Sequence, residues 1–228
     1  MSALAALGFR ALAPDLRGYG DSEAPADPAA YTILHVVGDA VGLDRAFIVG
    51  HDWGALAAWH LALSRPDRVR AVVALAVTYL PRGPRLPMDT FAARGDGFYI
   101  VQFQEPGRAE RAFARHDVAT VLNKFYSIES DDFTAPPGVE IVDFLEAPPS
   151  PPSCITGTVM VPAKFIVGDK DIGFKSGTEH YIKSEDFKSS VPDVEVAIID
   201  GHHFLQQEKP ERVNAEILSF LDKFTSKD

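Results

Sequence analysis

Cysteine is nearly absent from this sequence, because Cys154 is the single one among 228 residues. One thiol cannot form an intramolecular disulfide or supply a structural metal site of the thiolate kind. No phosphate-binding loop and no cluster of metal ligands is visible in the sequence either. We therefore expect neither a cofactor nor a metal, and a reducing, cytoplasmic location fits the cysteine usage.

Long apolar segments and excess positive charge are also missing. No apolar run approaches the about 20 residues that a membrane-spanning helix needs, and Met1 to Gly8 has no basic residue of a signal peptide. The chain carries 22 Lys and Arg against 32 Asp and Glu, a formal net charge of −10. Because phosphate backbones are bound by clustered Lys and Arg, nucleic acid is not expected as a partner.

What the sequence does contain is an alternation of short apolar runs with longer stretches of helical spacing. This pattern is typical of an α/β fold, in which helices cover both faces of a mostly parallel sheet. The runs predict five strands, at Phe9 to Pro14, Ala46 to Val49, Val69 to Ala76, Lys164 to Val167 and Val194 to Ile199. The spacing predicts helices at Leu34 to Val41, Trp53 to Ser64, Ala109 to Phe125 and Pro210 to Phe224.

The alternation is interrupted in the middle of the chain. We predict a first part of the core over residues 1–80, a shortened cap insertion over 81–158 and a second part of the core over 159–228. The end of the insertion is rich in proline, which lacks the amide donor and restricts the residue before it. We therefore expect a poorly ordered loop at Phe133 to Ser153.

The most informative motif is Gly50-His51-Asp52-Trp53-Gly54, at the junction between a predicted strand and an alanine-rich predicted helix. A Gly-x-Asp-x-Gly turn at such a junction is typical of a nucleophile elbow, in which small residues allow a strained turn that exposes the middle side chain. The alternative is that Asp52 caps the helix that follows. We interpret Asp52 as the nucleophile.

This motif and four other segments resemble plant-type soluble epoxide hydrolases of the α/β-hydrolase superfamily. The segments keep the family order of nucleophile, cap insertion, acid and histidine. The other four are Ala13-Pro14-Asp15-Leu16-Arg17-Gly18-Tyr19-Gly20-Asp21-Ser22, Phe103-Gln104-Glu105-Pro106-Gly107, Phe165-Ile166-Val167-Gly168-Asp169-Lys170-Asp171 and Gly201-His202-His203-Phe204.

The resemblance implies an α/β-hydrolase fold and a two-step reaction on a small epoxide with water. Asp52 would open the epoxide to a covalent ester, and a histidine would activate the water that hydrolyses the ester. The family pattern places this histidine immediately before the aromatic Phe204, which selects His203 over the adjacent His202. The acid that orients it matches Asp171, and Asp169 is interpreted as a solvated or capping residue.

The resemblance bears on two further residues, Tyr99 and Trp53, and His51 is interpreted from its place beside Asp52. Tyr99 matches the first of two cap tyrosines that stabilise or protonate the epoxide oxygen, whereas a half-buried cap aromatic is the alternative. The backbone amide of Trp53 would bind an oxyanion, and His51 would shape the site. Trp53 also keeps a haloalkane dehalogenase open, because in those enzymes a tryptophan at this position binds the leaving halide.

Two departures from the family pattern lead to a third hypothesis. No Asn-Tyr-Tyr-Arg-like segment with the second cap tyrosine precedes Lys164, and no His-Gly-Phe-Pro segment precedes Phe9. The chain therefore reads as one that opens inside the family's core and has a shortened cap. A catalytically degenerate protein with at most a binding role stays open. An exposed strand edge would also favour a partner along it, including a second copy of the chain.

Overall fold

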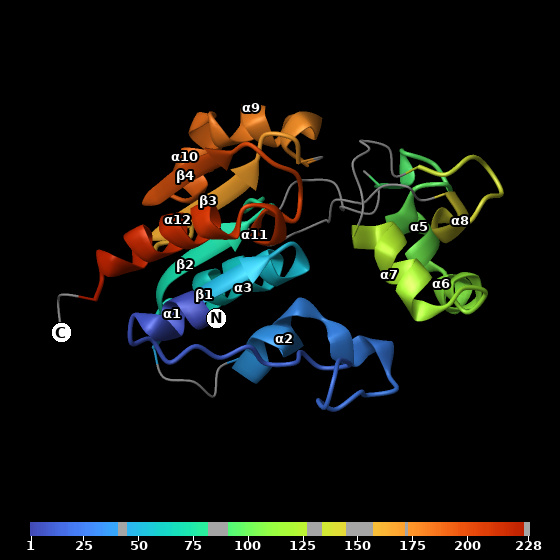
Figure 1. Cartoon of the computed structure of the whole chain (residues 1–228), viewed down its shortest axis with the longest axis horizontal. Coiled ribbons are helices and arrows are strands. Elements are labelled where there is room, and N and C mark those ends of the chain that lie inside the picture. The colour runs from blue at the N-terminus through green and yellow to red at the C-terminus, as the bar shows by residue number, and fades with distance from the viewer. Residues whose placement is uncertain (41–44, 82–90, 127–133, 145–156, 172, 226–228) are drawn as a thin grey trace.

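A computed structural model describes residues 1–40, 45–81, 91–126, 134–144, 157–171 and 173–225. Its centre is a parallel sheet in which four strands pair in the order β1-β2-β3-β4 (Figure 1). The strands are β1 (Ala46–His51), β2 (Val69–Leu75), β3 (Ala163–Gly168) and β4 (Val194–Ile199). These bounds confirm four of the five predicted strands to within about two residues at each end.

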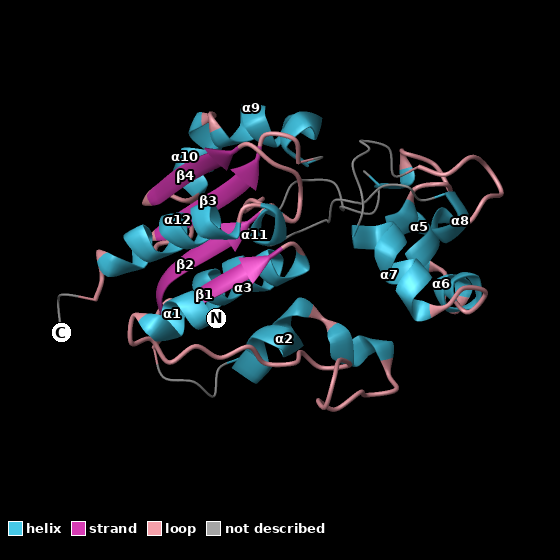
Figure 2. Cartoon of the chain, viewed as in Figure 1, coloured by secondary structure: helices cyan, strands magenta, loops and turns pink. Residues whose placement is uncertain are grey.

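Helices cover both faces of this sheet, as expected for apolar parallel strands (Figure 2). One face packs against α2 (Ile33–Ala40), α3 (Trp53–Ser64), α9 (Glu179–Ile182) and α10 (Glu185–Ser190). The other face packs against α1 (Ser2–Ala6), α11 (Leu205–Glu208) and α12 (Pro210–Asp222). Two short helical turns, η1 (Pro28–Tyr31) and η2 (Phe174–Thr178), precede α2 and α9. The predicted helices at Leu34, Trp53 and Pro210 are therefore confirmed.

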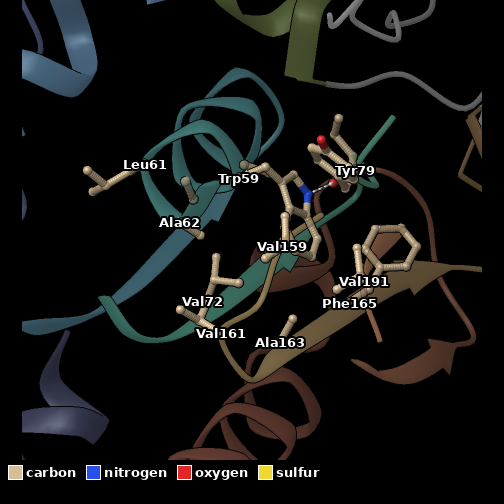
Figure 3. Packing of buried hydrophobic residues seen from close by; sticks show 14 of the residues in the cluster. Trp59, Leu61, Ala62, Val72, Tyr79, Val159, Val161, Ala163, Phe165 and Val191 are labelled. Carbon is tan, nitrogen blue, oxygen red and sulfur yellow. Dashed lines mark hydrogen bonds between the residues drawn. The ribbon is translucent and has the colours of Figure 1, made fainter. Parts of the chain in front are cut away.

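The larger core cluster lies between α3 and the sheet, around the fully buried Trp59 (Figure 3). Its indole Nε1–H donates a hydrogen bond to the carbonyl of Val77 at 3.0 Å, so the ring's one polar group is satisfied. Ala58 and Ala62 lie on the same helix and are also buried. Small side chains at these positions let α3 pack closely against the sheet, with its first turn next to the end of β1.

The predicted strand at Phe9 to Pro14 is wrong, because this segment forms no ladder with any described strand. Phe9 nevertheless packs against Phe47 of β1, with ring centroids 6.0 Å apart. Phe9 is thus partly buried without strand pairing, whereas Leu12 is exposed. Backbone pairing requires a partner strand alongside, and among the described residues none pairs with β1 on the side away from β2.

Two predictions for the middle of the chain need correction. The helix predicted over Ala109 to Phe125 is divided into α6 (Arg108–Phe113) and α7 (Val118–Tyr126). The division occurs where Asp117 Oδ1 accepts a hydrogen bond from the N–H of Thr120 at 2.9 Å and so begins a new helix. The segment expected to be poorly ordered contains α8 (Ile141–Phe144), whereas its residues 133 and 145–153 lie outside the described part.

The helices α5 (Tyr99–Gln104), α6, α7 and α8 form a separate group beyond the carboxyl ends of β1 and β2 (Figure 1). They have a small core of their own, which includes Phe98, Tyr99 and Ile141. The buried side chain of Gln102 connects α5 to the start of α8. It accepts a hydrogen bond from the N–H of Ile141 and donates one to the carbonyl of Val139. The division at residues 81 and 159 stays a prediction, since 82–90 and 145–156 lie outside the description.

Candidate active site

Asp52 occupies a sharp turn between β1 and α3. Its backbone has φ 54° and ψ −121°, a conformation that side-chain-bearing residues rarely adopt and that stores strain. A Cβ atom at Gly50 would lie 2.2 Å from the carbonyl oxygen of Gly54, so the turn requires glycine there. The carboxylate of Asp52 makes no capping hydrogen bond to α3. The alternative of a helix cap is therefore wrong, and the side chain is available for another role.

The carboxylate of Asp52 faces His203, which follows β4. Asp52 Oδ1 lies 3.3 Å from Nε2 of the imidazole, and Nδ1 of the same ring lies 2.8 Å from Asp171 Oδ2. His203 and Asp171 are buried, with 6% and 1% of their surface exposed. The structure thus brings together the three residues that the sequence analysis selected as nucleophile, base and orienting acid. Each comes from a loop at the carboxyl end of a different strand.

The two carboxylates control the charge of His203. Burial lowers the pKa of the imidazole, but hydrogen bonds with Asp171 and Asp52 and the negative charges of both acids outweigh it and raise the pKa to about 9. Below that pH the ring carries a proton and stands between two negative charges. Loss of the charge on either acid would therefore lower the pKa of His203.

The structure distinguishes Asp171 from Asp169 as the candidate acid, and His203 from His202 as the candidate base. Asp171 Oδ1 also accepts the N–H of Gly173 at 2.7 Å, which orients its other oxygen toward His203. Asp169 is on the exposed side of the same loop, where Oδ1 accepts the N–H of Gly201 at 3.1 Å. His202 Nδ1 lies 3.1 Å from Glu208 Oε2, and no hydrogen bond joins its ring to Asp171 or Asp169. The selection of His203 and Asp171 therefore has geometric support.

His51, the residue before Asp52, contacts the backbone of His203. Its Nε2–H donates a hydrogen bond to the carbonyl oxygen of His203 at 3.0 Å, and the two rings lie 4.8 Å apart between centroids. Burial and the neighbouring His203 lower the pKa of His51. A neutral ring with its proton on Nε2 suits this contact, so the geometry supports the expectation that His51 shapes the site.

Tyr99 begins α5 and has 5% of its surface exposed. Burial and then the negative charge of Asp52 raise its pKa above the usual value. The influence of Asp52 links the first turn of α5 electrostatically to the turn after β1. A phenol in this setting keeps its proton, so it can donate a hydrogen bond to a developing alkoxide. The side chain of Trp53, by contrast, is 48% exposed, and Trp59 belongs to the core.

Comparisons with known proteins agree with this arrangement. Residues 1–210 match the alpha/beta hydrolase fold family. Epoxide hydrolase 3 of Siraitia grosvenorii is 38% identical over 97% of this chain and 85% of its own length. The chain belongs to the epoxide hydrolase family of the alpha/beta hydrolase fold. Within this family, epoxide hydrolase A of Mycobacterium tuberculosis is 34% identical, over 96% of this chain and 84% of its own.

Solved epoxide hydrolases have the same fold. The enzyme from potato, Solanum tuberosum, has a TM-score of 0.86 and 35% sequence identity, covering 98% of this chain and 87% of that chain. A mutant epoxide hydrolase of Vigna radiata has a TM-score of 0.88 at 33% identity, covering 98% of this chain and 86% of that chain. The alignment with the Siraitia protein spans 273 positions, more than the 228 residues of this chain. That epoxide hydrolase therefore has residues within the alignment that have no counterpart here.

Two features of this epoxide hydrolase family member could not be read from its sequence. Ala76, which follows β2, has φ 68°, and together with Asp52 it is one of two non-glycine residues with positive φ among those described. Glu208 binds the loop of the catalytic histidine candidate, yet no motif marks it. Backbone strain and contacts between loops leave no local pattern in a sequence.

No described helix has the length and apolarity that crossing a bilayer requires.

Proposed function

We propose that the protein converts an epoxide and one water molecule to a vicinal diol through an ester on Asp52. The observation that carries the proposal is the chain of contacts from Asp52 to His203 to Asp171, which starts at a carboxylate on a strained turn. Its relatives are named epoxide hydrolases. A carboxylate needs no base for its attack, so His203 is left for the second step.

In the first step, an oxygen of Asp52 attacks one carbon of the epoxide. The new carbon–oxygen bond is the ester bond, and the electron pair of the broken bond goes to the epoxide oxygen. Tyr99 donates its hydrogen bond, and then its proton, to that oxygen. Its raised pKa keeps the phenol protonated next to Asp52 until the alkoxide forms. The product of this step is a hydroxyalkyl ester.

In the second step, His203 takes a proton from water while the water oxygen attacks the ester carbonyl of Asp52. The backbone N–H of Trp53 donates to the resulting oxyanion. Collapse expels the diol oxygen as an alkoxide, which takes the proton from His203, and the proton of the released Asp52 carboxyl returns through solvent to the Tyr99 phenolate. Asp171 holds the imidazole and stabilises its positive charge. Esterification removes the negative charge of Asp52, which lowers the pKa of His203 and so favours the neutral ring that a base requires.

Two other functions are separated from this one by single observations. A haloalkane dehalogenase would use the indole of Trp53 for the leaving halide, but this side chain is half exposed. A catalytically degenerate protein would bind ligands without turnover. The contact of 2.8 Å between His203 and the buried Asp171 favours a working site, because an unused imidazole has no need of a buried carboxylate.

We also propose a cytoplasmic location and a homo-oligomer. The single cysteine supports a reducing compartment. Val49 of β1 is 42% exposed, and the described part of the sheet has no strand on the outer side of β1, which supports association with a second copy along this edge. Sedimentation of the purified chain tests the oligomer, and a single monomeric species over a wide concentration range contradicts it.

The test of the function uses styrene oxide as the substrate. One turnover in water enriched in heavy oxygen should leave the first diol unlabelled and place the label in the Asp52 carboxylate, because water attacks the ester carbonyl. Asp52→Ala is the matched control and should form neither ester nor diol. Direct attack of water on the epoxide would label the first diol instead, and this result contradicts the proposed mechanism. Absence of both ester and diol in the wild type favours the degenerate protein.

A further inference from the structure

The backbone of the loop that carries His203 is held at two successive residues by carboxylates from two different segments, the loop after β3 and α11. Asp169 Oδ1 accepts the N–H of Gly201 at 3.1 Å. Glu208 Oε2 accepts the N–H of His202 at 3.0 Å and also lies 3.1 Å from its Nδ1. Gly201 is buried, so its N–H depends on a protein acceptor. The two carboxylates thus hold the backbone of the two residues that precede His203.

The loop of Asp169 is the one that carries Asp171, two residues later. It is joined to the histidine loop a second time, because the N–H of Lys170 donates to the carbonyl of Gly201 at 3.0 Å. The approach is close enough that a Cβ atom at Gly168 would lie 2.2 Å from the same oxygen. The two loops therefore form one hydrogen-bonded unit, in which displacement of one changes the distance between His203 and its acid.

We propose that Asp169 and Glu208 are positioning residues for hydrolysis of the ester. They act through the backbone of the histidine loop, and neither is in contact with Asp52. The inference rests on the proposed function above and deepens it. Alkylation by a carboxylate does not require the imidazole, whereas activation of water requires its correct orientation. Loss of either acceptor should therefore slow the second step selectively.

The test compares Asp169→Ala and Glu208→Ala with the wild type in rapid-mixing experiments with styrene oxide. We expect the rate of ester formation to stay within about twofold, and the rate of ester hydrolysis to fall about tenfold or more. Because hydrolysis then limits turnover, kcat and KM should fall together while kcat/KM stays constant. The fraction of enzyme present as ester, measured by intact protein mass, should rise at steady state.

Conservative variants separate the hydrogen bond from the charge. Asp169→Asn and Glu208→Gln keep an oxygen acceptor at the same place and should restore most of the hydrolysis rate. Asp200→Asn is the matched control, since Asp200 lies beside Gly201 in the sequence but pairs with the side chain of Lys170 at the surface. It removes one negative charge from the same loops and should leave both steps unchanged.

Each outcome supports or overturns the inference. A wild type that forms neither ester nor diol rejects the proposed function itself. If the wild type turns over and the Ala variants hydrolyse the ester at the wild-type rate, the two acids do not position the loop. Equal losses in both steps, or a fall in kcat at constant KM, would mean that they only maintain the folded state. Asn and Gln variants as slow as the Ala variants would exclude the backbone hydrogen bonds as the cause.

Discussion

The carboxylate of Asp52 lies 3.3 Å from Nε2 of His203, although the two residues follow β1 and β4, the outer strands of the described sheet. The loop after β4 therefore reaches back across the carboxyl ends of the strands between them. Asp171 follows β3 and contacts the far side of the imidazole. This arrangement places one histidine between two acids, which are expected to have different roles in the two steps.

The first prediction concerns the division of labour between the nucleophile and the base. His203→Ala should still be alkylated at Asp52 by styrene oxide and should then stall, so that the intact protein gains the mass of one epoxide. Asp52→Ala should gain nothing. Mass spectrometry of the intact protein and of the peptide containing Asp52 measures both results. If folded His203→Ala forms no adduct while the wild type turns over, the assigned roles are wrong.

A milder stall is expected for Asp171→Asn. The amide can donate to the imidazole and so favours the wrong tautomer, and the buried site offers little water to compensate. By analogy with serine proteases, the hydrolysis rate should fall by up to about 10⁴, with alkylation much less affected. Single-turnover kinetics separates the two steps. A variant in which alkylation falls as far as hydrolysis would show that Asp171 has no selective role in the second step.

The roles of Tyr99 and Trp53 distinguish epoxide from haloalkane chemistry. Tyr99→Phe removes the buried phenol hydroxyl. The rate of epoxide opening should fall by about 10² or more, because the alkoxide loses its hydrogen-bond donor. Trp53→Phe keeps the backbone amide and should change epoxide turnover little. The measurements are diol formation and halide release from a haloalkane. Intact epoxide turnover in Tyr99→Phe, together with loss of halide release in Trp53→Phe, would reverse the preferred substrate class.

The pKa of His203 predicts a pH dependence of stability. The two acids raise the pKa in the folded protein to about 9, whereas the unfolded chain titrates near about 6.5. The folded state therefore binds the His203 proton more tightly than the unfolded chain does. The stability that this proton contributes is complete below about pH 6.5 and is lost as the pH rises through about 9. Urea unfolding of the wild type and of His203→Gln over this range measures it. The difference in unfolding free energy should shrink as the pH rises.

The two tryptophans of α3 offer a matched test of the core. Trp59 is fully buried and its indole N–H is bonded, so Trp59→Ala should lower the unfolding free energy by about 3–5 kcal/mol. Trp53 lies on the first turn of the same helix with 48% of its surface exposed, and Trp53→Ala should cost much less. Chemical denaturation measures both. Equal losses would place the indole of Trp53 in a packed environment that the structure does not have.

Much of the fold was predictable because it depends on local patterns. The buried strands β2 and β3 are apolar apart from Arg70 and Lys164, and α3 was predicted with the bounds that the structure has. The turn at Asp52 was predictable for the same reason, since Gly50 and the strand and helix beside it are adjacent in the sequence. The resemblance selected His203 and Asp171, whose roles in the reaction stay predictions.

The sequence by itself determined which short segments form strands, helices and the turn at Asp52, because side-chain periodicity and glycine positions act within a few residues. Tertiary structure alone decided whether Phe9 to Pro14 has a partner strand, since pairing depends on what lies alongside. It also decided the charge of His203. That charge depends on burial and on two acids from distant loops, and distances between loops exist only after the chain has folded.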